Sequence, residues 1–184
     1  MSKQRDVVSE VIRLVAECGV DVGLILGGSV SEGLERADSD VDLFAIADAD
    51  VQPSLAGFSL VSEKNGSRLL ERQEGVFPVH VACWTTASLD EVLRCRQYML
   101  YPLLCGRVVL DAAGIAARYR ARIREYFDAH PAIERAWREQ LDNLRRSRDG
   151  LSEHLAFPQW SDFIRHIEEA FREEIAQQSP QRDK

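Results

Sequence analysis

The chain lacks three features that would assign it to common classes of protein. It has no apolar run near the eighteen or so residues that a membrane span needs, and no signal-peptide pattern precedes its first helical segment. Its 23 Lys/Arg residues are outnumbered by 30 Asp/Glu, and the net charge of −7 disfavours a nucleic-acid-binding surface. None of the four cysteines forms a C-x-x-C pair, so we expect reduced thiols. These absences favour a cytoplasmic protein without a membrane or nucleic-acid partner.

What the chain does have is one stretch rich in chemical information, residues 24–46, which reads LILGGSVSEGLERADSDVDLFAI. An apolar run ends at Gly27, and a polar loop that holds Asp40 and Asp42 follows. A second apolar run then begins at Leu43. Short apolar runs bounded by Gly and by Asp/Ser clusters are typical of strands that enter and leave a loop. The stretch therefore predicts a strand, a short helix from Ser29, a loop and a second strand.

The spacing of Asp40 and Asp42 has chemical consequences. At the start of a strand, residues two apart project from the same face, and Val41 between them points into a core. Two adjacent carboxylates repel each other, so a protein rarely builds such a pair without a cation to neutralise it. Carboxylate oxygens, together with water and substrate phosphates, are the ligands that Mg²⁺ prefers.

Upstream, Gly28 and Ser29 have features of a phosphate-binding element. Glycine lets the backbone approach a ligand closely, and Ser29 offers a hydroxyl at the N-terminus of the short predicted helix. Free N–H groups and the helix dipole attract phosphate there. A phosphate-binding turn and a metal-binding pair of carboxylates are thus joined by one short loop.

These residues resemble a known family. Gly28-Ser29, ten intervening residues and Asp40-x-Asp42 are similar to the signature of the DNA polymerase β-type nucleotidyltransferase superfamily, in particular its small bacterial branch of minimal and antibiotic nucleotidyltransferases. The resemblance implies a mixed α/β (α+β) sheet flanked by helices, and transfer of a nucleoside monophosphate, chiefly AMP, from an NTP such as ATP. It also implies that Asp40 and Asp42 are catalytic and hold Mg²⁺ or Mn²⁺, and that Gly28, Ser29 and Ser39 bind the nucleotide.

Three alternatives for this stretch can be weighed. A P-loop has the Gly28–Gly33 spacing but needs a lysine where Leu34 stands. An EF-hand loop that started at Asp38 would need Gly and Glu at its sixth and twelfth places, where the chain has Leu43 and Ala49. A solvated acidic turn between two strands is the remaining alternative, since Asp and Ser favour turns. The Gly-Ser element argues against it.

A third strand is predicted over residues 76–84, with alternation that places His80 on the face opposite the neighbouring valines. In the superfamily a third carboxylate usually stands on such a strand, and the matching position here is His80. A histidine can act as a metal ligand or a base near neutral pH, but it does not supply a third negative charge. A structural role for a lone histidine between valines is the alternative. Glu71 and Glu74 on the preceding segment are weaker candidates for the missing carboxylate.

The sequence as a whole predicts two structural parts, residues 1–115 and residues 116–184. Residues 1–115 form the nucleotidyltransferase core, with a helix over 4–18, a hairpin around Asn65-Gly66, and a helix from Ser88 to near Pro102. Residues 116–184 have few β-branched residues and many Arg, Glu, Ala and Leu, which favours a small helical bundle. We expect its helices over 116–128, 132–150 and 160–177.

The acceptor of the nucleotide is open. A small molecule resembling an antibiotic and a protein hydroxyl are both compatible with the motif, and a homodimer is possible. A different class also remains: a catalytically degenerate member that binds a nucleotide or a partner without turnover, which the absent third carboxylate supports. In that case we expect His80 to be turned away from Asp40 and Asp42, with no other acid nearby.

Overall fold

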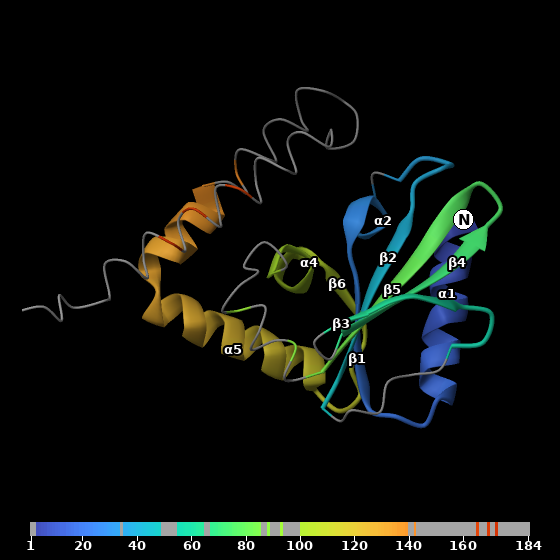
Figure 1. Ribbon diagram of the computed structural model, residues 1–184, viewed down its shortest axis with the longest axis horizontal. Coiled ribbons are helices and arrows are strands. Elements are labelled where there is room, and N and C mark those ends of the chain that lie inside the picture. The colour runs from blue at the N-terminus through green and yellow to red at the C-terminus, as the bar shows by residue number, and fades with distance from the viewer. Residues whose placement is uncertain are drawn as a thin grey trace, which may run out of the picture.

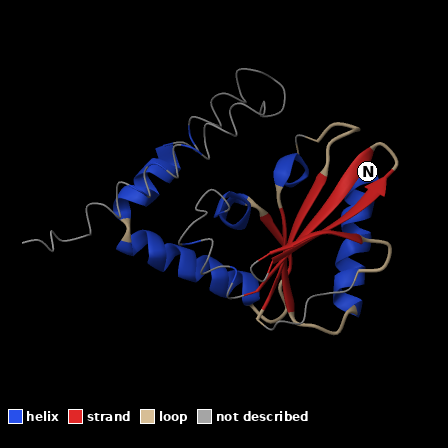
Figure 2. Ribbon diagram, viewed as in Figure 1, coloured by secondary structure: helices blue, strands red, loops and turns tan. Residues whose placement is uncertain are grey.

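The computed structural model is a mixed α/β fold built around one six-stranded sheet (Figures 1 and 2). The residues that it describes are 3–33, 35–48, 55–64, 67–85, 88, 93, 100–139, 142, 165, 169 and 172. The helices are α1 (Lys3–Glu17), α2 (Gly28–Glu32), α4 (Leu100–Cys105) and α5 (Ile115–Ala129), and residues 131–139 are also helical. The strands are β1 (Val22–Leu26), β2 (Val41–Ala47), β3 (Ser59–Lys64), β4 (Ser67–Glu74), β5 (Phe77–Thr85) and β6 (Arg107–Leu110).

The sheet has the strand order β3-β4-β5-β2-β1-β6. The central strand β2 pairs with β1 on one side in antiparallel orientation and with β5 on the other in parallel orientation. The remaining pairs are antiparallel. The start of β2 and the middle of β5 are therefore neighbours, with Asp42 directly opposite His80.

Each face of the sheet is covered by different helices (Figure 1). Helix α1 carries an apolar stripe that includes Val7, Val11 and Val15, and it packs with alternate residues of β1, β2 and β5 into one buried cluster. On the other face, α4, α5 and the helical residues 131–139 pack against Ile25, Ile46 and other residues of the same strands. The alternation of side chains along a strand thus separates two cores.

The start of α5 is fixed directly on the sheet. A side chain at Gly23 of β1 would bring its Cβ within 2.7 Å of the backbone nitrogen of Ala116, so only glycine allows this approach. The carboxylate of Asp111 accepts hydrogen bonds from the N–H groups of Ala116 (2.9 Å) and Ala117 (3.1 Å). The division of the chain at residue 115 stays a prediction, and α5 shares a core with the sheet.

Most predicted elements agree with the structure to within one or two residues. One difference concerns Pro102, near which a helix was expected to end. Pro102 instead lies in the first turn of α4, where a proline is tolerated because the N–H groups of that turn have no partner within the helix. The expected turn at Asn65-Gly66 and most of the expected helices over 132–150 and 160–177 lie outside the described residues.

Two findings concern partners and thiols. No helix among the described residues is both long enough and apolar enough to cross a membrane. Cys83 is buried, and this burial raises the pKa of its thiol to about 12.

Candidate active site

The two carboxylates of the motif stand at the beginning of β2. Asp40 directly precedes the strand and is exposed, and Asp42 is its second residue. Val41 between them is fully buried, which directs both aspartates away from the core under α1. One possible ligand atom from each of Asp40, Asp42 and His80 lies within 4.8 Å of the others, as expected of residues that share a cation. Among the described residues, the structure brings the predicted metal-binding pair and the predicted third group together.

The turn before α2 is attached to the same end of β2. The N–H of Gly27 donates to the carbonyl of Asp42 at 2.8 Å. Gly28 has a φ of +61°, and a Cβ placed there would lie 3.0 Å from Oδ2 of Asp42. The left-handed backbone favours glycine at Gly28, and a side chain there would also press against the Asp42 carboxylate. The glycine of the motif fits against the aspartate of the motif.

Ser29 has the arrangement expected of a ligand-binding hydroxyl. Its Oγ is buried and has no hydrogen-bond partner in the described part of the structure. The neighbouring Ser31 differs, since its Oγ donates to the carbonyl of Gly28 at 2.9 Å. A buried polar group without a partner costs free energy, and a bound ion or water is one way to supply the partner. The residues around Asp42 and Ser29 thus fit a metal-bound phosphate.

Ser39 holds the loop that carries Asp40. Its Oγ accepts a hydrogen bond from the N–H of Arg36 at 2.8 Å, and its own N–H donates to the Arg36 carbonyl at 3.2 Å. Its predicted contact with the nucleotide stays a prediction. The side chain of Gln4 supports the same loop by donating to the carbonyls of Arg36 (2.6 Å) and Ala37 (3.2 Å).

Sequence reasoning missed Gln4, although a signal was present. Gln4 lies on the apolar stripe of α1, in phase with Val7, Val8, Val11 and Val15, and it is 3% exposed. A polar residue at a core position of an amphipathic helix needs hydrogen-bond partners, which indicates a loop packed against the helix there.

His80 joins the two aspartates to a further acid. Its Nδ1 lies 3.1 Å from Oδ1 of Asp42, and its Nε2 lies 3.2 Å from Oε2 of Glu71 on β4. The hydrogen bond to Asp42, the charges of Asp42 and Asp40 and the hydrogen bond to Glu71 raise the pKa of His80, although burial opposes them. His80 is therefore turned toward the aspartates, in contrast to the orientation expected of a degenerate site.

The two glutamates considered for the third carboxylate have different positions. Glu71 pairs with His80 across β4 and β5, whereas Glu74 lies at the end of β4 opposite Phe77. Glu74 forms ion pairs with Lys3 (3.6 Å) and Arg72 (3.5 Å). Glu71 thus belongs to the site through His80, and Glu74 joins β4 to α1.

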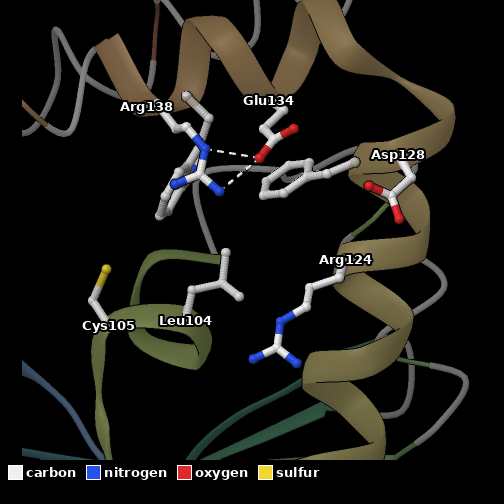
Figure 3. Close-up of a pocket in the computed structure, with 8 residues that line it drawn as sticks. Leu104, Cys105, Arg124, Asp128, Glu134 and Arg138 are labelled. Atoms are coloured by element: carbon white, nitrogen blue, oxygen red, sulfur yellow. Dashed lines mark hydrogen bonds and ion pairs between the residues drawn. The ribbon is translucent and has the colours of Figure 1, made fainter.

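A cavity lies among the helices on the same side of the sheet as the site. Asp42, Phe44 and Ile46 alternate along one face of β2, and Phe44 and Ile46 pack in the cluster that contains α4 and α5. The cavity has a volume of about 470 Å³. It is lined by Leu104, Cys105, Arg124, Phe127, Asp128, Glu134, Trp137 and Arg138 (Figure 3). Apolar side chains and charged groups of both signs therefore surround a space large enough for a small molecule.

Comparison with known proteins identifies the family. The nucleotidyltransferase domain family matches residues 6–101, which include the sheet up to β5 and the residues Gly28, Ser29, Ser39, Asp40, Asp42, Glu71 and His80. The chain therefore belongs to the nucleotidyltransferase domain family, as the resemblance implied. Its described mixed sheet with flanking helices agrees with the predicted fold class.

Similarity to individual proteins is more distant. No curated protein matches the chain. Among solved structures, a nucleotidyltransferase-like protein from Exiguobacterium sibiricum 255-15 shares 10% identity, with 98% of this chain and 67% of that chain covered and a TM-score of 0.39.

Proposed function

We propose that this protein is a metal-dependent nucleotidyltransferase that moves a nucleoside monophosphate from an NTP, with ATP as the first candidate, to a hydroxyl group. The observation that carries the proposal is the convergence of the Gly28 turn, the Ser29 hydroxyl and the Asp40–Asp42 pair at one end of β2. A structural acidic turn would not need a glycine packed against its aspartate.

Each residue has a role in this proposal. Asp40 and Asp42 would hold one or two Mg²⁺ or Mn²⁺ ions, whose positive charge stabilises the attacking and leaving oxygens when they are bound. The Ser29 hydroxyl and the N–H groups at the start of α2 bind the β- and γ-phosphates of the NTP. Gly28 leaves the space in which phosphate and the Asp42 carboxylate approach each other. His80 serves as a base or as an accessory ligand.

The reaction follows from this positioning. The acceptor oxygen forms a bond to the α-phosphorus in line with the bond that breaks, the acceptor hydroxyl gives its proton to His80 or to water, and pyrophosphate leaves. The protein contributes orientation and electrostatic stabilisation, and it forms no covalent intermediate.

For the acceptor we propose a small molecule that occupies the cavity between α4, α5 and residues 131–139. The cavity lies on the same side of the sheet as Asp42 and offers the carboxylate of Asp128, which suits an acceptor with a cationic group, whereas the carboxylate of Glu134 is paired with Arg138. A protein acceptor is the alternative within the same chemistry, and its hydroxyl would meet the same end of β2.

A non-catalytic module that binds a nucleotide or a partner is the second candidate. The observation that favours it is the histidine in the place of a third carboxylate, with both ring nitrogens close to acids. The orientation of His80 toward Asp42 favours catalysis instead.

The test uses α-labelled ATP, GTP, CTP and UTP with Mg²⁺ or Mn²⁺, a panel of aminoglycosides and lincosamides, and cell lysate. Label on a small molecule supports the proposed acceptor class, and label on a protein band supports the alternative. Transfer of label to either acceptor must be lost in the Asp42→Asn variant. Metal-dependent nucleotide binding without any transfer would establish the non-catalytic module.

A further inference from the structure

The side chains of three adjacent strands form a continuous line from the candidate metal site to an acid that the motif does not include. Asp42 on β2, His80 on β5 and Glu71 on β4 are directly opposite one another in the register of the sheet. The two contacts along this line are 3.1 and 3.2 Å, and each uses a different nitrogen of the imidazole. Both nitrogens of His80 are thus committed, one toward the aspartates and one toward Glu71.

We propose that Glu71 positions His80 as a nitrogen ligand beside Asp40 and Asp42, and that this pair makes the site prefer a divalent transition-metal ion to Mg²⁺. The inference rests on the proposed function, because it concerns the same cation site. It adds Glu71 as a positioning residue and assigns the selectivity for the ion.

The possible ligand atoms of His80, Asp42 and Asp40 lie close together. Mg²⁺ and divalent ions of similar size hold octahedral ligands at about 2.1 Å, which places adjacent ligand atoms about 3 Å apart. The distance between Nδ1 of His80 and Oδ1 of Asp42 is 3.1 Å, and one atom of Asp40 lies within 4.8 Å of both residues' ligand atoms. His80 and Asp42 are therefore spaced as adjacent ligands of one cation, and Asp40 lies close by.

The other ring nitrogen of His80, Nε2, has the Glu71 carboxylate as its partner. A histidine that binds a metal commonly donates its second N–H to a carboxylate, which fixes the ring orientation and raises its basicity as a ligand. Glu71 is in that place, 3.2 Å from Nε2. With Nε2 beside Glu71, Nδ1 is the ring nitrogen that faces the aspartates.

The imidazole of His80 is a softer ligand than a carboxylate, and this difference affects which ion the site prefers. Carboxylates and water suit Mg²⁺, whereas imidazole favours first-row transition ions. A third carboxylate at position 80 would raise the negative charge of the site and suit Mg²⁺ better. The replacement of an oxygen ligand by the nitrogen of His80 shifts the preference away from Mg²⁺ and toward first-row transition ions, least for Mn²⁺ and more for Co²⁺.

The experiment measures binding of Mn²⁺ alone to the full chain, without any substrate. Affinity is obtained from the electron paramagnetic resonance signal of free Mn²⁺, and Mg²⁺ affinity from its competition. Electron spin echo envelope modulation then reports whether a nitrogen is bound to the Mn²⁺. The variants are His80→Asp, Glu71→Gln and Asp42→Asn. Glu63→Gln on β3 is the matched control, because it removes the same charge from an exposed ion pair with Arg68.

We expect nitrogen coupling in the wild type and in Glu63→Gln, and its loss in His80→Asp. Glu71→Gln should weaken Mn²⁺ binding by about tenfold or more, as removal of such supporting acids does. Mg²⁺ binding should change less, so the ratio of the two affinities falls. His80→Asp should lower that ratio further by favouring Mg²⁺. Circular dichroism and thermal unfolding confirm that each variant is folded.

Other results overturn the inference in distinguishable ways. Mn²⁺ binding that depends on Asp42 but shows no nitrogen coupling removes His80 as a ligand and leaves the proposed function intact. Nitrogen coupling with unchanged affinities in folded Glu71→Gln removes Glu71 as the positioning residue. Mn²⁺ binding that does not depend on Asp42 contradicts both this inference and the proposed metal site.

Discussion

The two faces of the central sheet have different roles, although the same strands form both of them. On the face under α1, Val41, Leu43 and Val81 are 0–1% exposed and pack into an apolar cluster. On the opposite face, Asp42 and His80 remain partly open, and their strands become apolar again farther along, where α4 and α5 cover them. Alternate residues of one strand thus supply a rigid support and a candidate site.

This comparison explains why the candidate site has a defined geometry without a large polar core around it. The position of Asp42 is fixed by its buried neighbours on both sides, Val41 and Leu43. A substitution on the open face should therefore affect chemistry with little effect on stability. A substitution on the covered face should do the reverse.

The largest effect is expected for Asp42→Asn or Asp40→Asn. Asparagine keeps the shape of the side chain but not the charge that holds a cation, and the cation contributes several kcal/mol to the transition state. Nucleotidyl transfer should fall by about a thousandfold or more. The rate of label transfer from an α-labelled NTP is the measurement.

Asp38→Asn is the control, because it removes the same charge from an exposed residue of the same loop. It should keep the wild-type rate. Equal losses in Asp38→Asn and Asp42→Asn would mean that the charge of the loop, and not the geometry of the pair, is responsible.

Leu43→Ala should have the opposite profile. Leu43 is 1% exposed, and truncation of a buried leucine leaves a cavity that costs about 2–5 kcal/mol of unfolding free energy. Urea unfolding measures this loss, and the decrease in transfer activity well below the unfolding midpoint should be far smaller than that of Asp42→Asn. Leu60→Ala on β3 makes the same change at a residue that is 54% exposed and should alter stability little. A stable Leu43→Ala variant would contradict the account of the covered face.

Gly28→Ala tests the contact between the two motif elements. The left-handed backbone at Gly28 costs an alanine about 1–2 kcal/mol. The new Cβ would also lie 3.0 Å from the Asp42 carboxylate and displace it, so transfer should fall. Gly33→Ala is a matched control, since Gly33 has a φ of +73° but nothing within 4 Å of its Cβ. We expect similar losses of stability in both variants and loss of activity in Gly28→Ala alone.

The smallest effect concerns the ion pair that joins α1 to β4. The hydrogen bond from Arg72, at 2.9 Å, lowers the pKa of Glu10 below its ordinary value of 4.5. The pair therefore stabilises the fold above that value, and its contribution is lost as the pH falls through the lowered pKa. Because Glu10 is well exposed, the contribution should be below about 1 kcal/mol.

Urea unfolding of wild type and Glu10→Gln at pH 7 and at acidic pH measures this contribution. The difference between the two proteins should be present at pH 7 and should shrink in acid. A difference that grows in acid would contradict the assigned sign. Glu17→Gln, which removes an exposed pair with Arg13 within one helix, should show a smaller difference throughout.

The local elements of the site were predictable because they depend on short-range patterns. The bounds of β1 follow from an apolar run, and the position of His80 follows from alternation along β5. The family signature located Asp40 and Asp42. The side-chain contacts between these elements could not be predicted in the same way, because they depend on which strands are neighbours in the sheet.

The role of Glu71 illustrates the missing information. Its contact with His80 requires the antiparallel register of β4 and β5, nine residues apart along the chain, and a shift of one residue would place the side chain on the other face. Alternation along β4 places Glu71 and Glu74 on opposite faces, and the register decides that Glu71 is the one opposite His80.

The most direct test of the central claim compares α-labelled and γ-labelled ATP in parallel reactions with Mn²⁺ and a competent acceptor. A nucleotidyltransferase should place the α-label on the acceptor and release the γ-label as pyrophosphate, and Asp42→Asn should abolish both. Transfer of the γ-label to the acceptor, or release of the γ-label as free phosphate without α-label transfer, would contradict the account.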